Sequence, residues 1–327
     1  MTTPDRHAIT APDDAPRLDV LIARVLDISR NQAAILIAGG QVTIGGRREK
    51  ASYRARLGEE VTVEIHHSAD REVVGEDIPL TIVYEDDDLL VVDKPGGMVV
   101  HPAPGNWTGT LVNALKGRGG TLSGITDEFR EGIVHRLDKE TSGLLLVARS
   151  DRAHRVLGAA LQAREITRRY AALTWGHVNA DRLTVEKPIA RDPRDRKRMA
   201  VVNTGRPART DLTRLARFDS TDLLRAHLHT GRTHQIRVHL ASIGHPVVGD
   251  DTYGGGGGRK LVGLPQRRHF LHAAWLIFRH PVSGKTIDLR SALPGELHRA
   301  VVAAAGPDVS IADTNPLDFF GFYNVDP

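Results

Sequence analysis

The 327-residue chain contains no cysteine. Disulfide bonds, thiol nucleophiles and thiolate zinc sites are therefore excluded together. The sequence has no basic start followed by an apolar stretch, and no apolar run approaches the roughly 20 residues of a membrane-spanning helix. We therefore expect a cytoplasmic protein with no membrane partner. A hydrophobic content of 40% is sufficient for an ordinary packed core.

Several motifs of catalytic or binding sites are also missing. The chain has no GxSxG nucleophile elbow and no HExxH zinc motif, and the run GGGGGRK at 254–260 lacks the GK[ST] ending of a phosphate loop. We interpret the five glycines as a flexible surface loop. His227 and His229 would supply only two ligands from one strand face, so no metal site is predicted. Glycosidase chemistry through the carboxylates of Asp138 and Glu140 stays open.

Positive charge is concentrated in two segments of the chain. From Arg17 to Leu57 eight Lys and Arg stand against three Asp and Glu, and from Val185 to Leu240 thirteen stand against six, although the net charge of the whole chain is only +4. The rest of the chain is therefore acidic. Two separate basic segments indicate a polyanion that is contacted at two places, with nucleic acid as the leading candidate. Two solvated faces are the alternative interpretation.

The first 65 residues suggest a short tail followed by a small module. Residues 1–16 have little apolar content and three prolines, so a disordered lead-in is expected. Over residues 17–65 we expect two helices, the second beginning at Ser29 and ending at Gly39 and Gly40, and then strands at 42–44 and 60–65. Residues 66–75 are predicted to be a linker.

A larger domain is expected over residues 76–303. Apolar runs predict strands around 80–84, 89–92, 144–147 and 170–174, with a helix that begins after Ser150 or Asp151. Strands and helices are mixed without regular alternation, which favours an α+β fold over a doubly wound parallel sheet. Residues 304–327 form a tail with four aromatic residues. This tail would dock on the domain or bind a partner.

Two dense clusters of polar residues carry the candidate chemistry. The stretch GIVHRLDKETSGLLLVARS at 132–150 places Asp138 directly before an apolar strand, and the stretch TGRTHQIRVHL at 230–240 supplies Arg232, His234 and Arg237. An adjacent guanidinium keeps a buried carboxylate ionised, and an ionised, oriented carboxylate can act as a nucleophile. A structural ion pair is the alternative interpretation of these residues.

Five motifs, in order, resemble those of the RluA/RluD-type RNA pseudouridine synthases. They are GIVHRLDKETSGLLLVA, ITRRYAAL, PIARDPRDRKRMAV, TGRTHQIRVHLASIGHPVVGDDTYG and FLHAAWLIFRHPVSG. The resemblance covers roughly residues 17–303, and the module at 17–65 resembles the S-four RNA-binding domain. It implies a catalytic domain with a mixed, largely antiparallel sheet, preceded by a small α+β domain that binds RNA.

The resemblance also assigns roles to individual residues. It implies that Asp138 is the catalytic aspartate, that Tyr170 is the active-site tyrosine and that Arg237 pairs with Asp138. It implies that Arg136 enters the RNA stack in place of the target base. The reaction moves the bond between uracil and ribose from N1 to C5, without a redox step or a second reactant, so no cofactor and no metal are expected. Arg168 stands where many members of the family have lysine.

The implied partner is RNA, with large-subunit rRNA or its precursor particle as the favoured substrate. Asp192 stands where the family has histidine, which would weaken a local RNA contact. The alternative functions are a ribosome-assembly factor without catalytic activity and a sugar hydrolase. The alternative role of His135 and His234 is only to position the backbone. The residues predicted to contact RNA are Arg17, Arg30, Arg47, Arg48, Lys50, Arg136, Arg194, Arg196, Lys197, Arg198, Arg232 and His234.

Overall fold

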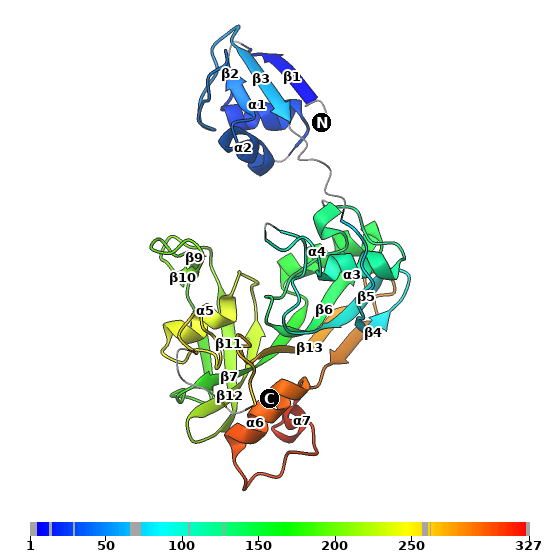
Figure 1. The fold of residues 1–327 in the computed structure, drawn as a ribbon, viewed down its shortest axis with the longest axis vertical. Helices are drawn as coiled ribbons and strands as arrows, with labels where there is room; N and C mark the ends of the chain where they lie inside the picture. The colour runs from blue at the N-terminus through cyan, green and yellow to red at the C-terminus, as the bar shows by residue number, and fades with distance from the viewer. Residues whose placement is uncertain are drawn as a thin grey trace. The chain divides into compact units, whose positions relative to one another are not determined.

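The computed structural model describes residues 5–12, 15–28, 30–65, 73–103, 105–126, 128–256, 261 and 263–324. The chain divides into two compact units, residues 1–72 and residues 73–327 (Figure 1). Most of the expected linker, residues 66–72, lies outside the described residues, and so does Ser29, the expected start of the second helix.

The first unit packs two helices against a small antiparallel sheet. Alternation along the central strand turns Val61 and Val63 inward, where both are fully buried together with Leu18 and Ile22 of the first helix. The spatial order of the strands is β1-β3-β2. The elements are β1 (Asp5–Thr10), α1 (Leu18–Val25), α2 (Arg30–Ala38), β2 (Val42–Ile44) and β3 (Glu60–Ile65).

The expectation of a disordered lead-in is wrong for the part that forms β1. This strand pairs antiparallel with β3 along its whole length, from Asp5 opposite Ile65 to Thr10 opposite Glu60. Main-chain hydrogen bonds to a neighbour hold such an edge strand, so its side chains need not alternate between apolar and polar. Residues 1–4, 13 and 14 of the expected lead-in lie outside the described residues.

The second unit is built on a nine-stranded sheet in the order β4-β5-β6-β13-β7-β12-β11-β8, with β14 paired to β13. Among the described strand pairs of this sheet, β6 and β13 alone run parallel, which confirms the expected α+β class with a largely antiparallel sheet. The strands are β4 (Thr81–Glu85), β5 (Leu89–Lys94), β6 (Ser142–Ala148), β7 (Thr167–Trp175), β8 (Arg182–Glu186), β11 (Arg209–Arg217), β12 (Thr221–Leu228), β13 (Leu271–Arg279) and β14 (Thr286–Arg290). Strands β9 (Ile189–Arg191) and β10 (Met199–Val201) form a separate hairpin.

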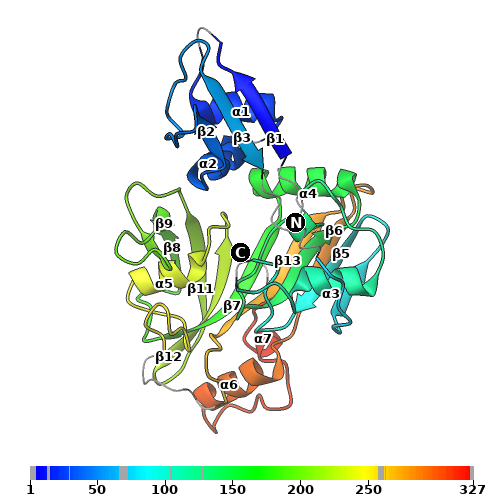
Figure 2. The ribbon, with the colours of Figure 1, turned by 45° about the horizontal axis from the view of Figure 1, so that its top comes forward.

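Helices cover both faces of this sheet (Figure 2). Leu144 and Leu146 of β6 face α4 (Asp151–Ala163), whereas Leu145 and Val147 face the side of α3 (Leu111–Arg118). Helix α4 begins as predicted, because the hydroxyl of Ser150 accepts a hydrogen bond from Ala153 N at 3.1 Å. The remaining helices are α5 (Gln235–Ser242), α6 (Gly295–Ala305) and α7 (Pro316–Phe319), with a 3-10 turn at Glu128–Arg130. No helix in the described part of the chain could span a membrane.

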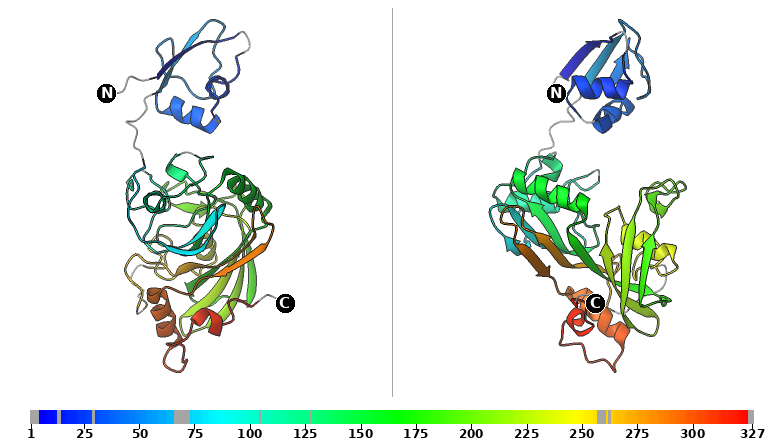
Figure 3. Two further views of the ribbon diagram at one scale, coloured as in Figure 1. Left: turned by 90° about the vertical axis from the view of Figure 1, so that its right-hand side faces the viewer. Right: turned by 180° about the vertical axis from the view of Figure 1, so that it is seen from behind.

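The C-terminal tail docks on the second unit. Helices α6 and α7 lie side by side at one end of it (Figure 3), and Phe322 and Tyr323 are buried in the main core. The hydroxyl of Tyr323 donates a hydrogen bond to Ser291 O at 2.8 Å, and Nη1 of Arg225 donates to the carbonyls of Phe322 and Asn324 at 2.8 and 2.7 Å. Of the two alternatives, docking on the domain is therefore confirmed for the tail up to residue 324.

The interpretation of the glycine run as a flexible surface loop is wrong for Gly255 and Gly256. Gly255 and Gly256 are buried, and Gly255 O accepts a hydrogen bond from Nε1 of Trp175 at 2.6 Å. A Cβ atom at Gly255 would lie 1.6 Å from Val247 O, so a side chain cannot fit at this position. Close packing requires the glycine here, and Gly257 and Gly258 lie outside the described residues.

Because two of its histidines are buried, we expect the second unit to lose stability in acid. His269 and His272 are 3% and 1% exposed, and burial lowers the pKa of His272 to about 3 and that of His269 well below its usual value. The unfolded chain binds protons near pH 6.5 that the folded chain cannot bind, so stability is lost as the pH falls below 6.5, by about 1.4 kcal/mol per histidine per pH unit. Urea unfolding should therefore give a free energy at least about 2.5 kcal/mol lower at pH 5.5 than at pH 7, because other histidines whose pKa is lowered by burial, His135 among them, add to the loss. Equal values at the two pH values would contradict this prediction.

Candidate active site

The segment that carries Asp138 is held against β6. Ile133 forms an isolated antiparallel bridge with Val147, and Nε2 of His135 accepts a hydrogen bond from the main-chain N–H of Leu146 at 3.0 Å. Burial lowers the pKa of His135 to about 3, so the ring stays neutral and can accept this bond. His135 thus positions backbone, and Asp138 follows with 16% of its side chain exposed.

Three buried side chains hold the residues that follow Asp138. Nζ of Lys94 donates a hydrogen bond to the carbonyl of Lys139 at 3.1 Å, and Nη1 of Arg268 donates one to the carbonyl of Glu140. The hydroxyl of Thr141 is hydrogen-bonded to Nε2 of His269 at 2.9 Å. Burial lowers the pKa of Lys94 to about 7. The sequence interpretation missed these supporting residues because no motif links residue 94 or 268 to residue 138.

Arg237 connects two carboxylates. Its Nη1 lies 3.0 Å from Oδ2 of Asp138, while its Nε and Nη2 donate to the two oxygens of Asp250 at 2.7 and 2.9 Å. The Oδ1 atom of Asp250 also accepts hydrogen bonds from the main-chain N–H groups of Thr252 and Tyr253. Burial opposes the charge of Arg237, but the bonds to Asp250 outweigh burial and raise the pKa of the guanidinium. Asp250 therefore fixes the guanidinium that faces Asp138.

The turn before α5 brings a histidine and a tyrosine to the same place. His234 has φ +55°, in the left-handed region, and its Nδ1 is hydrogen-bonded to the hydroxyl of Tyr253 at 2.8 Å. Its Nε2 lies 3.8 Å from Oδ1 of Asp138. Burial lowers the pKa of His234, so the ring is neutral at neutral pH. The guanidinium of Arg237 lies over the Tyr253 ring, 5.0 Å from its centroid.

Tyr170, on β7, is the third of the residues predicted to be catalytic. The side chain is 5% exposed, and it lines one cavity of about 450 Å³ together with Asp138 and Arg237. Burial raises the pKa of Tyr170, so its hydroxyl is protonated at neutral pH. The three residues predicted to be catalytic, which are far apart in the sequence, thus line a single cavity. A carboxylate, a guanidinium and an aromatic ring can together hold a polar ring and react with the group attached to it.

The predicted RNA contacts of the second unit lie in and around this cavity. Arg136 is exposed and lines it, as do the half-buried Arg232 and His234. Arg194, Arg196 and Lys197 are exposed in the loop between β9 and β10, where Asp192 Oδ1 accepts a hydrogen bond from Arg194 N. Arg198 instead packs its guanidinium over Tyr253, 5.2 Å from the ring centroid.

The basic residues of the first unit fall into two groups. Arg17 and Arg30 both bind the carboxylate of Asp19, at 3.1 and 3.0 Å, and Asp19 is 4% exposed. These two residues therefore stabilise the module itself, although their side chains remain partly exposed. The other members of the set, Arg47, Arg48 and Lys50, are exposed.

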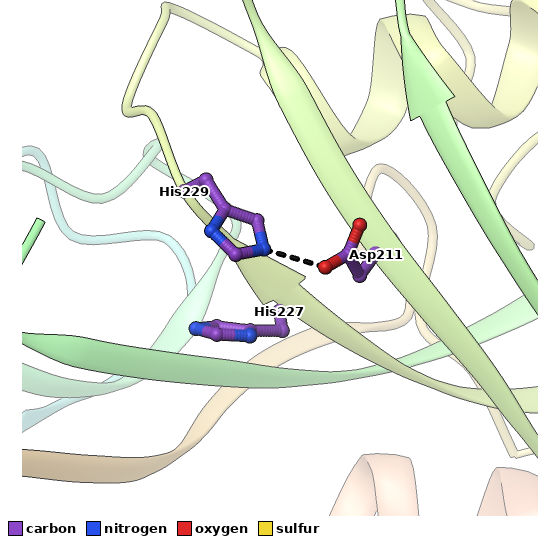
Figure 4. A group of neighbouring side chains, drawn as sticks. All are labelled: Asp211, His227 and His229. Carbon is purple, nitrogen blue, oxygen red and sulfur yellow. Dashed lines mark hydrogen bonds and ion pairs between the residues drawn. The ribbon is translucent and has the colours of Figure 1, made fainter.

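Asp211, His227 and His229 form a cluster with donor atoms suited to a metal (Figure 4). His227 lies near the end of β12, and His229 directly follows this strand. Register pairing places Asp211 of β11 opposite His227, so Asp211 supplies the third donor, which the sequence did not reveal. However, Asp211 already accepts hydrogen bonds from Arg209, Thr184 and His229. Asp86, Asp88 and His280 form a second such group, in which Asp86 accepts hydrogen bonds from Tyr84 and His280. The expectation of no metal site stays a prediction.

Comparison with known proteins covers both units. The profile of the RNA pseudouridylate synthase family matches residues 88–242, and the profile of the S4 domain matches residues 16–61. The first match includes Asp138, Tyr170 and Arg237. The second begins after β1, so this strand lies outside the matched S4 region.

Individual relatives match over most of their length. The Uncharacterized RNA pseudouridine synthase YlyB of Bacillus subtilis is 43% identical over 292 residues, which cover 88% of this chain and 95% of the relative. The Ribosomal large subunit pseudouridine synthase D of Xanthomonas campestris is 41% identical over 309 residues, covering 91% and 92%. The solved structure of Human RNA Pseudouridylate Synthase Domain Containing 1 shares 30% identity and a TM-score of 0.54, covering 69% of this chain and 89% of that chain. The chain therefore belongs to the RNA pseudouridine synthase family of isomerases and carries an S4 domain ahead of its catalytic unit.

Proposed function

We propose that the protein isomerises uridine to pseudouridine in large-subunit rRNA or its precursor particle, with Asp138 as the reacting carboxylate and without a cofactor. One observation carries the proposal: Asp138 is held by Arg237, itself fixed by Asp250, in a cavity that Tyr170 also lines. Several relatives carry the name Ribosomal large subunit pseudouridine synthase D, which supports the choice of RNA. We place the reaction in the cytoplasm.

The chemistry uses residues that the cavity provides. The bond from N1 to C1′ breaks, the uracil turns, and a bond from C5 to C1′ forms, while C5 loses a proton and N1 ends with one. The product is an isomer of the substrate, so atoms balance without a second reactant. Asp138 attacks or deprotonates the nucleotide, Arg237 holds the carboxylate in position through its hydrogen bond, and the ring of Tyr170 supports the detached uracil.

A uridine inside folded RNA must leave its stack to reach this cavity. Flipping costs a few kcal/mol. This cost is offset by contacts with the flipped base and by a side chain that fills the vacated space. Arg136 is exposed at the cavity and suited to fill that space. Phosphate contacts from the loop between β9 and β10 and from Arg47, Arg48 and Lys50 would supply salt-dependent affinity.

Tritium release tests the proposal directly. Uridine labelled with tritium at C5 loses its label to water when the new carbon bond forms. We expect release from a large-subunit rRNA transcript or from precursor particles, and none from small-subunit rRNA. If every RNA and particle is bound but none loses label, the protein is an RNA-binding assembly factor rather than an isomerase.

A further inference from the structure

Arg168 is a buried cation in the wall of the catalytic cavity. Its side chain is only 9% exposed, and among the described residues its Nε has no hydrogen-bond partner. Alternation along β7 turns Arg168 and Tyr170 to the same face, and both line the cavity that contains Asp138. A buried guanidinium normally forms hydrogen bonds or ion pairs, so a cation with an unpaired donor in this wall is suited to an anionic ligand.

The cavity holds an excess of positive charge around Arg168. Asp138 is the sole Asp or Glu among the described residues that line it, and Arg237 already binds this carboxylate. Burial lowers the pKa of Arg232, and the neighbouring charges of Arg206 and Arg164 lower it further. A cluster of cations of this kind attracts an anion. The arginines that line the cavity besides Arg237 are Arg136, Arg164, Arg168, Arg206 and Arg232.

A glycine leaves room for the guanidinium of Arg168. A Cβ atom at Gly231 would lie 3.1 Å from Nη1 of Arg168, closer than side-chain packing normally allows. Gly231 directly precedes Arg232 in the turn that leads to α5. The Arg168 guanidinium therefore lies next to this turn, on the same face of β7 as Tyr170.

We propose that Arg168, with Arg232 beside it, binds a backbone phosphate of the flipped nucleotide inside the catalytic cavity. The inference rests on the proposed function and deepens it by naming the contact that anchors the target nucleotide. A phosphate that enters a protein cavity loses water and must gain charged donors, and a planar guanidinium matches its oxygens. A nucleotide whose uracil lies against Tyr170 carries its own phosphates only one sugar away.

The test measures how the affinity for large-subunit rRNA depends on salt. Each phosphate contact contributes about 0.7 to 0.9 to the slope of log K against log salt concentration. Arg168→Gln should reduce the slope by about that amount and raise the KM for tritium release roughly tenfold or more. Arg168→Lys, which keeps the charge, should retain the slope. Arg155→Gln is the matched control, because it removes the same charge from an exposed position on α4 and should change neither quantity.

Competition by small nucleotides identifies the phosphate. Uridine 5′-monophosphate or uridine 3′-monophosphate should inhibit the wild type about tenfold more strongly than it inhibits Arg168→Gln, whereas uridine should not distinguish the two proteins. An Arg168→Gln variant with an unchanged slope, whether or not its kcat or melting temperature falls, would show that Arg168 is structural and would overturn the inference. That result leaves tritium release by the wild type intact, so it is distinct from a failure of the proposed function.

Discussion

Replacement of Asp138 by asparagine is expected to abolish tritium release from uridine labelled at C5. Asparagine keeps the shape of the side chain but removes the charge, so it can neither attack nor deprotonate the nucleotide. Loss of a reacting group of this kind lowers kcat roughly 10³-fold or more. The measurement is tritium release under single-turnover conditions with saturating protein, so that weaker binding cannot imitate the effect.

The structure predicts that this variant still folds and binds RNA. Arg237 keeps both hydrogen bonds to Asp250 when the charge at residue 138 is lost, so no buried guanidinium is left without a carboxylate. Glu140→Gln is the matched control, because it makes the same type of change two residues away. Release at the normal rate by Asp138→Asn would refute the assigned role, and equal loss in both variants would favour a pair of reacting carboxylates.

Replacement of Asp250 by asparagine is expected to reduce both stability and turnover. Arg237 would exchange its bidentate partner for a neutral amide and be drawn toward Asp138, which must remain available for the nucleotide. Removal of one partner from a buried ion pair costs about 3 kcal/mol. A displacement of about 1 Å at the reacting group lowers kcat about 10²-fold. Urea unfolding and tritium release would measure the two effects.

Asp251→Asn provides the comparison for this prediction. It makes the same change at the next residue, whose side chain is exposed, and should leave stability and kcat close to the wild type. If Asp250→Asn also kept its kcat within a factor of about two, the geometry of Arg237 would not limit the reaction.

The three residues predicted to be catalytic could be grouped from the sequence because they lie in recognisable motifs. Asp138, Tyr170 and Arg237 are separated by dozens of residues, and the structure shows that they line one cavity, while their catalytic roles stay predictions. The support of the group could not be predicted in this way. Asp250 lies in the same motif as Arg237, as one of two adjacent aspartates, but nothing local shows that its carboxylate is buried against Arg237.

Elements that depend on a distant neighbour were also hard to predict. The buried Lys94 reads as the end of a strand before a turn, yet its Nζ binds the carbonyl of residue 139, 45 positions away. His234 is predicted to contact RNA, and the structure adds that its Nδ1 is hydrogen-bonded to Tyr253 and that its Nε2 lies 3.8 Å from Asp138. Sequence periodicity and charge predict how a residue behaves within its own segment. The contacts of Lys94 and His234 form between segments that are distant in the sequence, so neither signal reveals them.

Strand β1 has a practical consequence for anyone who shortens this protein. The S4 match begins at residue 16, so a fragment cut at that boundary would lack the strand that covers one side of β3. The main-chain N–H and C=O groups of β3 that pair with β1 would then face solvent beside an apolar core. Such an exposed strand edge pairs with strands of other molecules. Such a fragment would self-associate, and its oligomers could be mistaken for a natural assembly.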